Sequence, residues 1–342
     1  MPFSASKRKG TLNGILFVAI FAAAATFIAK IPFIEHLHIS PLVVGIVLGI
    51  FYANTLHNTI PSAWEGGITF SGKKILRFAI VFYGFNITFQ QIADVGMAGF
   101  MVSLVMLVST FIIGTIAGMR LFKMDRDTSM LTASGAAVCG AAAVAATEPV
   151  LNAQSHKVGV AVGMVVLFGT IAMFVYPLMY PFLDMDPATF GIYVGGTIHE
   201  VAQVVAVGGA IEGAADNAVI VKMTRVMLIA PMLILLGLYI SYMAKRQGGA
   251  GAKLQLVIPW FAVYFVGMAG VNSLALIPDN IVHIIREIDT FLLTVAMTAL
   301  GMNTRFAKFK ELGAAPLYTA TLMFAWLVIG GYFVTLWAVK LF

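Results

Sequence analysis

The chain has 342 residues, of which 60% are hydrophobic and 11% charged. Soluble domains carry about a quarter charged residues, so the composition excludes a soluble domain and predicts a polytopic protein embedded in the lipid bilayer. The net charge of +6 does not indicate a nucleic-acid partner, because it is distributed as an orientation signal for a membrane protein.

Uncharged apolar runs predict an all-α fold whose helices cross the membrane. The first run follows Lys7, Arg8 and Lys9 and is about 20 residues long. We interpret it as an uncleaved span, because the apolar region of a signal peptide is shorter. Residues 62–74 are predicted to form a short interfacial helix. About eleven transmembrane segments are predicted, at 11–31, 40–57, 75–90, 97–120, 129–152, 157–182, 188–211, 218–244, 256–275, 289–304 and 314–340.

Basic residues predict the orientation of the chain. Five groups, at 7–9, 73–77, 120–126, 245–253 and 305–310, hold 15 of the 21 Lys and Arg residues. Alternating spans place all five groups on one side of the membrane, and the side rich in Lys and Arg is the cytoplasmic one. We therefore expect a cytoplasmic N-terminus.

Two segments, 129–152 and 188–211, leave the number of crossings open. As simple spans they put the His156–Lys157 pair outside and the acidic loop at 184–186 inside, which reverses the usual preference. As re-entrant segments they return to the side from which they start, and both loops then fall correctly. Both segments are rich in Gly and Ala and have a polar centre, as broken or re-entrant helices do. Eleven spans with two broken helices and nine spans with two hairpins both fit the sequence.

The outer parts of the chain repeat one another. Residues 41–56 match 259–274 at an offset of 218, and 79–96 match 296–313 at an offset of 217. The two copies start on opposite sides of the membrane, which predicts an inverted repeat of the kind that secondary transporters use; shared glycine packing in unrelated helices is the alternative. The matched pairs are Gly49 and Gly267, Asn54 and Asn272, Gly84 and Gly301, Asn86 and Asn303, Gly96 and Gly313, and Gly114 and Gly331.

We therefore predict one transmembrane domain over 1–342. It is divided into repeat A at about 11–120, a central broken-helix region at about 128–212 and repeat B at about 218–342.

Between the repeats lie two segments of small residues with a polar centre. They read SGAAVCGAAAVAATEP from Ser134 and GGTIHEVAQVVAVGG from Gly195. Aligned at an offset of 60, Cys139 falls on His199 and Gly140 falls on Glu200. We predict a pair of broken helices that face each other across a central site.

Helices that begin at these breaks favour an anionic ligand, because a helix N-terminus presents free N–H groups and the positive end of the helix dipole. Small side chains let the ligand approach the backbone, and hydroxyl and amide groups donate hydrogen bonds. Asn86 and Asn303 occupy matched positions in the repeats, where they either line the site or bond between helices. The predicted substrate-binding residues are Ser134, Gly135, Cys139, Gly140, Thr197, His199, Gln203, Asn86 and Asn303.

His199 and Glu200 are the predicted ion-coupling residues. Histidine titrates in the physiological range, and a carboxyl group in a desolvated pocket can carry a proton at neutral pH. The coupling ion is therefore H⁺ or Na⁺. The alternative is that Glu200 pairs with Lys222 or Arg225 as structural charge partners, because buried ions are usually paired.

Other chemistry is less well supported by the residues. HEVAQ lacks the second histidine of a zinc-protease motif, no nucleotide-binding GxxxxGK[ST] is present, and the single cysteine excludes a cysteine-based metal cluster. We expect no metal, no cofactor and no enzymatic activity. A membrane-embedded enzyme using Cys139, His199 and Glu200 is the main alternative, and a channel or regulatory membrane protein is the other.

Five stretches of the chain carry a resemblance to a known family: KKILRFAIVFYGFNITFQQI (73–92), VCGAAAVAA (138–146), GTIHEVAQVVAVG (196–208), VKMTRVMLIAP (221–231) and LLTVAMTALGMNTRF (292–306). Over nearly its whole length the chain resembles the YeiH-type family of proposed sulfate exporters, which are bacterial inner-membrane proteins. Glu200 stands where the family usually has Asp, and Ala137-Val138 and Ala141-Ala142 replace Ser-Ile and Ser-Ala. The resemblance implies a transporter of the inner membrane and, by analogy, a fold similar to bile-acid/sodium symporters.

The sequence thus predicts a secondary transporter, an exporter of a small inorganic or organic anion such as sulfate or a sulfonate, that works by alternating access. Its expected partners are the anion, the coupling ion and the lipid bilayer. The oligomeric state is open, with a homodimer as one option.

Overall fold

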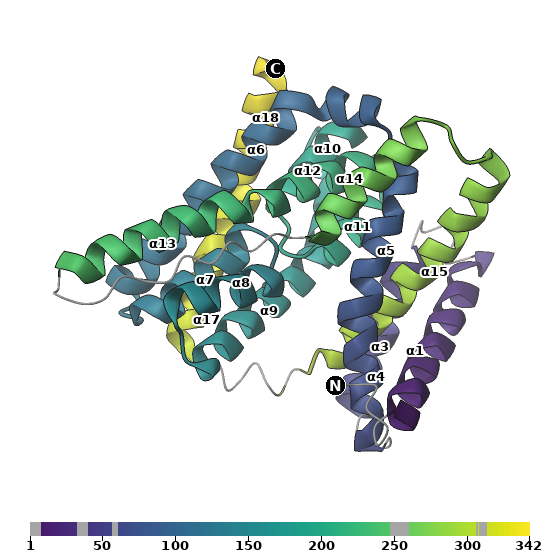
Figure 1. The fold of residues 1–342 in the computed structure, drawn as a ribbon, viewed down its shortest axis with the longest axis horizontal. Helices are drawn as coiled ribbons and strands as arrows, with labels where there is room; N and C mark the ends of the chain where they lie inside the picture. Colours follow the sequence, from purple (N-terminus) through teal and green to yellow (C-terminus); the bar gives the residue numbers. More distant parts are fainter. Residues whose placement is uncertain (1–7, 33–39, 57–60, 247–259, 306, 308–312) are drawn as a thin grey trace. The chain divides into compact units, whose positions relative to one another are not determined.

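The computed structural model describes residues 8–32, 40–56, 61–246, 260–305, 307 and 313–342, and helices are the regular secondary structure in these ranges. Short 3₁₀ and π segments join or extend several helices, namely η2 (Ser62–Trp64), η3 (Ser71–Ile75), η4 (Gly84–Asn86), η5 (Ala117–Leu121), η6 (Tyr180–Phe182) and η7 (Trp326–Gly330). The helices labelled in Figure 1 are α1 (Arg8–Ala29), α3 (Pro41–Thr55), α4 (Glu65–Phe70), α5 (Leu76–Tyr83), α6 (Phe89–Ile116), α7 (Arg126–Ala137), α8 (Ala141–Leu151), α9 (Ser155–Met179), α10 (Pro187–Thr197), α11 (Val201–Gly208), α12 (Ala215–Met227), α13 (Ile229–Arg246), α14 (Trp260–Ser273), α15 (Asp279–Asn303), α17 (Ala314–Ala325) and α18 (Gly331–Leu341).

The chain is an all-helical, multi-pass membrane protein. Within the described ranges, five helical stretches are long and apolar enough to cross a bilayer, and α3 and α8 are shorter apolar helices. Each segment predicted as a span contains helix. The long stretches are Arg8–Ala29, Phe89–Leu121, His156–Phe182, Ala215–Met243 and Ala314–Leu341.

Two boundaries differ from the prediction. Helix α15 begins at Asp279, ten residues before the predicted span at 289–304, because 279–289 is an amphipathic stretch whose charges exclude it from a search for uncharged runs. The predicted interfacial helix at 62–74 is helical, but it continues through η3 into α5 and does not stand apart. Part of the predicted span 256–275 and parts of three basic groups lie outside the described residues.

The chain forms two compact units. Unit 1 consists of residues 1–90 and 261–307, and unit 2 of residues 91–260 and 308–342. Each unit therefore contains helices from both of the predicted repeats.

In unit 1, glycines bring helices into close contact. Helix α3 packs on α15 at Gly49 and Gly301, where an added methyl group would lie within 3 Å of the backbone of the other helix. Two asparagines at matched repeat positions make equivalent bonds. Asn54 donates to the carbonyl of Thr304 and Asn272 donates to that of Ile87, both at 3.0 Å, so each amide binds the end of a helix from the other copy.

Unit 2 is organised along α9, whose 25 residues make it about 37 Å long. Helices α7 and α8 form hairpin 1 (residues 126–151). Lys157 near the start of α9 lies 2.6 Å from Asp125 at the start of α7, and α8 ends just before α9 begins. The chain therefore enters along α7, turns at 138–140 and returns along α8. The turn reaches the middle of α9, where Gly135 and Gly140 pack against Val165.

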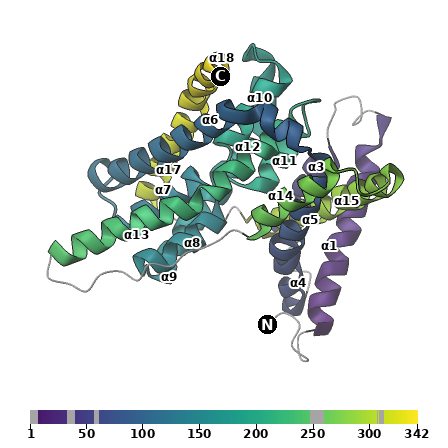
Figure 2. The same ribbon diagram turned by 45° about the horizontal axis from the view of Figure 1, so that its top comes forward.

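Helices α10 and α11 form hairpin 2 (residues 187–208) at the opposite end of α9. The rings of Tyr180 and Phe190 lie 4.6 Å apart, which places the start of α10 beside the end of α9. Gly191 and Gly208, from the two arms, both pack against the start of α12 at Ala214 or Ala215. In Figures 1 and 2, α8 lies beside α9, while α10, α11 and α12 form a group toward the other end of the unit.

The tip of hairpin 2 reaches the same level of α9 as the tip of hairpin 1. Gln203 packs against Gly169, only four residues, or about 6 Å, from Val165. Within unit 2, each of the two segments therefore folds back on itself as a helical hairpin, and the two tips meet.

The two hairpins also share their surroundings. Asp125 caps α7 by accepting from the backbone N and hydroxyl of Thr128, and Asp186 caps α10 in the same way through Thr189. Matched glycines pack on equivalent arms: Gly114 of α6 lies against α7 and Gly331 of α18 lies against α10. Gly96 and Gly313, another matched pair, both adopt a positive φ where the following helix starts.

Candidate functional site at the hairpin tips

Two fully buried cations of α12 bind the C-terminal ends of α7 and α10. The Lys222 ammonium donates to the carbonyls of Val138 and Ile198 at 2.7 and 2.6 Å. The Arg225 guanidinium donates to the carbonyls of Ala136, Ala137 and Gly196 at 2.6–2.9 Å. Each cation contacts both hairpins, and both side chains are 0% exposed.

This arrangement follows from the chemistry of helix ends. The last carbonyls of a helix have no partner within it and form the negative end of the helix dipole. Two such ends meet at the tips, so they attract two cations. The sequence suggested that Lys222 and Arg225 serve as charge partners of Glu200. Their hydrogen bonds go to carbonyls, while Glu200 also interacts electrostatically with Lys222.

Glu200 lies at the N-terminal ends of both returning arms. It is the N-cap of α11 in a capping box: its carboxylate accepts from the Gln203 backbone, and the Gln203 side chain accepts from the Glu200 N–H at 3.0 Å. The same carboxylate accepts from the Ala141 N–H at the start of α8, at 3.3 Å. One carboxylate thus bridges the two tips.

Gly140 makes this bridge sterically possible. Its φ of +72° is unfavourable for a residue with a side chain. In addition, a methyl group at this position would clash with Cγ of Glu200. The two positions that align at an offset of 60 are therefore in contact.

Two polar atoms at the tip of hairpin 2 lack hydrogen-bond partners among the described residues. They are Nδ1 of His199 and Nε2 of Gln203, and these side chains are 3% and 0% exposed. A buried polar atom without a partner costs about 1–3 kcal/mol, and such groups are typical of functional sites. Cys139 is a buried free thiol in the turn of hairpin 1 and interacts electrostatically with Glu200.

The other predicted substrate ligands are engaged in packing or in hydrogen bonds that belong to the fold. The hydroxyl of Ser134 donates to Leu131 O within α7, and Gly135 is a packing position against α9. The hydroxyl of Thr197 donates to Tyr193 O and accepts from Tyr176, so it is also committed to the fold. Asn86 and Asn303 belong to unit 1, where each donates to a carbonyl of its own helical segment, Tyr83 or Ala299.

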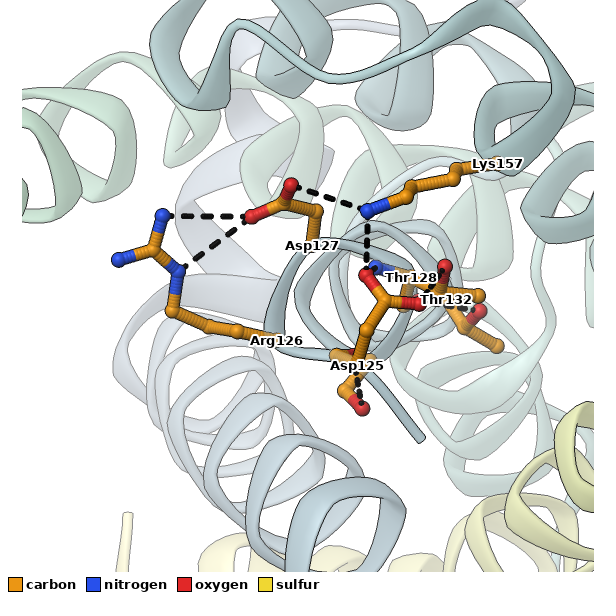
Figure 3. Close-up of polar contacts among 7 residues, drawn as sticks. Asp125, Arg126, Asp127, Thr128, Thr132 and Lys157 are labelled. Carbon is orange, nitrogen blue, oxygen red and sulfur yellow. Dashed lines mark hydrogen bonds and ion pairs between the residues drawn. The ribbon is translucent and has the colours of Figure 1, made fainter. Parts of the chain in front are cut away.

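A charged cluster at the base of hairpin 1 was not predicted as a site. Lys157 binds Asp125 at 2.6 Å and Asp127 at 3.2 Å, and Asp127 also binds Arg126 at 3.3 Å (Figure 3). Burial acts to raise the pKa of Asp125, but the hydrogen bonds from Lys157 and Thr128 outweigh it and hold the pKa at about 2. The Asp-x-x-Thr cap was visible in the sequence as a helix start, whereas the part of Lys157 depends on the fold.

Asp289 in α15 of unit 1 is a further residue that sequence reasoning missed. Its side chain is 2% exposed, and both carboxyl oxygens lack a hydrogen-bond partner among the described residues. A buried carboxyl group without a partner is a candidate for carrying a proton.

Comparisons with known proteins place the chain in a family. The family model described as Conserved hypothetical protein 698 matches residues 13–320. A UPF0324 membrane protein of Bordetella pertussis is 50% identical over 324 residues, which cover 94% of this chain and 93% of that protein. The UPF0324 inner membrane protein YeiH of Escherichia coli K12 is 44% identical over 323 residues, covering 94% and 92%. No solved structure matches the chain.

These similarities extend over nearly the whole of the chain and of its relatives, and they agree with the several apolar helices of the fold. The resemblance inferred from the sequence is confirmed, and the protein resides in the inner membrane. The chain belongs to the UPF0324 family of membrane proteins, the family of YeiH.

Proposed function

We propose that the protein is a secondary transporter that moves a small anion across the inner membrane by alternating access. The observation that carries the proposal is the meeting of two helical hairpins, which start at opposite ends of α9 and end at one buried polar cluster. Secondary transporters bind substrates near the bilayer midplane, between discontinuous helices of inverted repeats.

The dimensions of hairpin 1 support this placement. The 12 residues of α7 are about 18 Å long. This length is close to half the thickness of a 30 Å hydrocarbon core together with the interface on one side. We infer that nine helical segments span the membrane and that the two hairpins enter from opposite sides, which accounts for eleven membrane segments. With the basic groups in the cytoplasm, hairpin 1 opens to the cytoplasm and hairpin 2 to the other side.

The inverted repeat is supported by contacts that occur twice. Asn54 and Asn272 bind equivalent helix ends, and Gly114 and Gly331 pack on the first arms of the two hairpins. Such a repeat gives a transporter two equivalent ways to open, one to each side. A likeness to bile-acid/sodium symporters stays an analogy at the level of the fold.

The charges at the tips support an anion as substrate. Lys222 and Arg225 are two fixed cations, and the starts of α8 and α11 add two positive helix ends, against the single carboxylate of Glu200. A compact oxyanion such as sulfate or a sulfonate matches this set of donors. Export of sulfate is the direction and substrate that the family resemblance suggests.

Counterflow in proteoliposomes tests the proposal. Liposomes that contain the purified protein and are preloaded with unlabelled sulfate should take up radiolabelled sulfate in a saturable way. Gly140→Ala should abolish this uptake, because the methyl group displaces Glu200 and the turn cannot keep its φ. The matched control Gly159→Ala lies in α9, where a methyl group meets open space, and should transport like the wild type.

Other outcomes would point to the alternatives. Flux that rises linearly with sulfate concentration would indicate a channel. Absence of flux with sulfate, thiosulfate and methanesulfonate would contradict an anion transporter. Loss of function in Cys139→Ala would favour an enzyme that uses the thiol, whereas we expect this variant to transport.

A further inference from the structure

We propose that the carboxylate of Glu200 is an internal substitute for the transported anion. When ionised, it occupies the helix N-termini at the tips. When it takes up a proton from solvent, it leaves them to the substrate, so that one proton and one anion bind together. This inference rests on the proposed function and names the coupling ion as H⁺ and the mode as symport.

The position of the carboxylate is that of a bound anion. It accepts N–H groups from two different helix starts, Ala141 of α8 and Gln203 of α11. Helix N-termini are the usual places where proteins bind anions through backbone N–H groups. Here a side chain fills the position, and the glycine at 140 leaves room for that side chain or for a ligand of similar size.

Two further donors lie at the same tip and are unused. His199 directly precedes Glu200, and Gln203 is already bound to the Glu200 backbone through its amide oxygen. The His199 Nδ1 and the Gln203 Nε2 are buried and have no partner among the described residues. Either atom can donate to an oxyanion that replaces the carboxylate.

The charges around Glu200 favour replacement of its carboxylate by a substrate anion over a tip that holds no negative group. Lys222 and Arg225 are buried and stay bound to carbonyls, so protonation of Glu200 leaves two positive charges without an acidic counterpart at the tips. A negative substrate restores the balance. Lys222 of α12 and Cys139 of hairpin 1 interact electrostatically with Glu200. Arg225 lies three residues beyond Lys222 on α12, His199 precedes Glu200 in the chain, and Glu148 and Asp216 lie toward the ends of α8 and α12 that are away from the tips.

Competition between deprotonated Glu200 and the substrate predicts how the affinity for the anion depends on pH. If one proton binds with each anion, the dissociation constant of the anion rises about tenfold per pH unit wherever the free protein holds Glu200 as a carboxylate. Glu200→Gln mimics the protonated form and keeps an acceptor oxygen for the capping box. It should bind the anion more tightly than the wild type at alkaline pH, with no pH dependence.

Binding of sulfate to the purified full-length protein tests this by calorimetry across a pH series. Glu148→Gln is the matched control, because it removes a carboxylate from hairpin 1 at the end of α8 that lies away from the tip, and it should keep the wild-type slope. A weaker affinity in Glu200→Gln would overturn the proposal and identify Glu200 as a cap or a cation ligand. A wild-type slope in Glu200→Gln would also overturn it and would direct attention to Asp289 as the proton carrier.

A second measurement needs no variant. Sulfate added to the wild-type protein in weakly buffered solution should be accompanied by the uptake of about one proton per bound anion at alkaline pH. Binding without proton uptake would refute the competition but leave an anion transporter possible. If no small oxyanion binds to the wild type or to Glu200→Gln, the proposed function itself fails.

Discussion

Lys222 and Arg225 illustrate how buried cations are tolerated at membrane depth. A buried charge is costly unless it is compensated, and here the hydrogen bonds that compensate it go to five backbone carbonyls. The carbonyls benefit equally, because they lie at helix ends without other donors. The two side chains therefore hold the tips of both hairpins together.

Replacing Lys222 by Met tests this role. The variant leaves the carbonyls of Val138 and Ile198 without this donor, and we expect a loss of about 3–5 kcal/mol of stability, the usual cost of breaking a buried charged network. The apparent Tm in detergent should fall clearly. Lys340→Met, at an exposed position in the last turn of α18, is the matched control and should leave Tm unchanged. An unaltered Tm in Lys222→Met would mean that the tips do not depend on this cation.

At the scale of the secondary-structure element, the hairpins share a capping motif but differ in what holds their bases. Both begin with an aspartate that accepts from a threonine three residues later. Those threonine hydrogen bonds lower the pKa of Asp186. Among the described residues, an ion pair with α9 is found for hairpin 1 alone, through Lys157 (Figure 3).

The pKa of Asp125 predicts how this ion pair depends on pH. The folded-state pKa of about 2 lies below the ordinary value of 3.8, so the contribution to stability is complete above the ordinary value and is lost as the pH falls through about 2. Because the side chain is 50% exposed, screening limits this contribution to about 1 kcal/mol or less.

Asp125→Asn should therefore lower the thermal stability slightly at neutral pH, and its difference from the wild type should shrink as the pH falls from about 4 to about 2. Thermal unfolding in detergent across this range measures the difference. Asp94→Asn is a suitable control on another helix. A difference that grows at acid pH would have the wrong sign and would refute the role of the ion pair.

At the scale of the whole molecule, the path of the two central segments decides the topology. If the N-terminus is cytoplasmic, as the basic groups predict, hairpins place residue 154 on the cytoplasmic side and residue 188 on the other, whereas eleven simple spans reverse both positions. Both arrangements then predict residue 212 on the outside. The exposed positions Gln154, Ala188 and Glu212 allow the two arrangements to be distinguished.

Single-cysteine variants in a Cys139→Ala background make this test. A membrane-impermeant maleimide added to intact cells with a permeable outer membrane should label Glu212→Cys and Ala188→Cys, but should label Gln154→Cys only after the cells are opened. Labelling of Gln154→Cys in intact cells together with protection of Ala188→Cys would show that the segments cross the membrane.

The sequence by itself determined the features that depend on local residue patterns. Uncharged apolar runs located the helices, Gly140 and Glu200 marked the two breaks, and internal similarity paired Asn54 with Asn272. The predicted start of helix α15 lies too far along the chain. A search for uncharged runs misses the first turns of this helix, because they are amphipathic and carry charged residues. These signals are local because hydrophobicity, backbone freedom and capping act over a few residues.

Only the tertiary structure decided which distant groups meet. Lys222 binds carbonyls 84 and 24 residues away, Ala141 donates to a carboxylate 59 residues away, and Lys157 joins hairpin 1 to α9. A broken helix and a hairpin have the same local pattern of glycine, polar centre and capped start. What separates them is the direction of the second arm, and that direction is set by the helices and buried cations against which it packs.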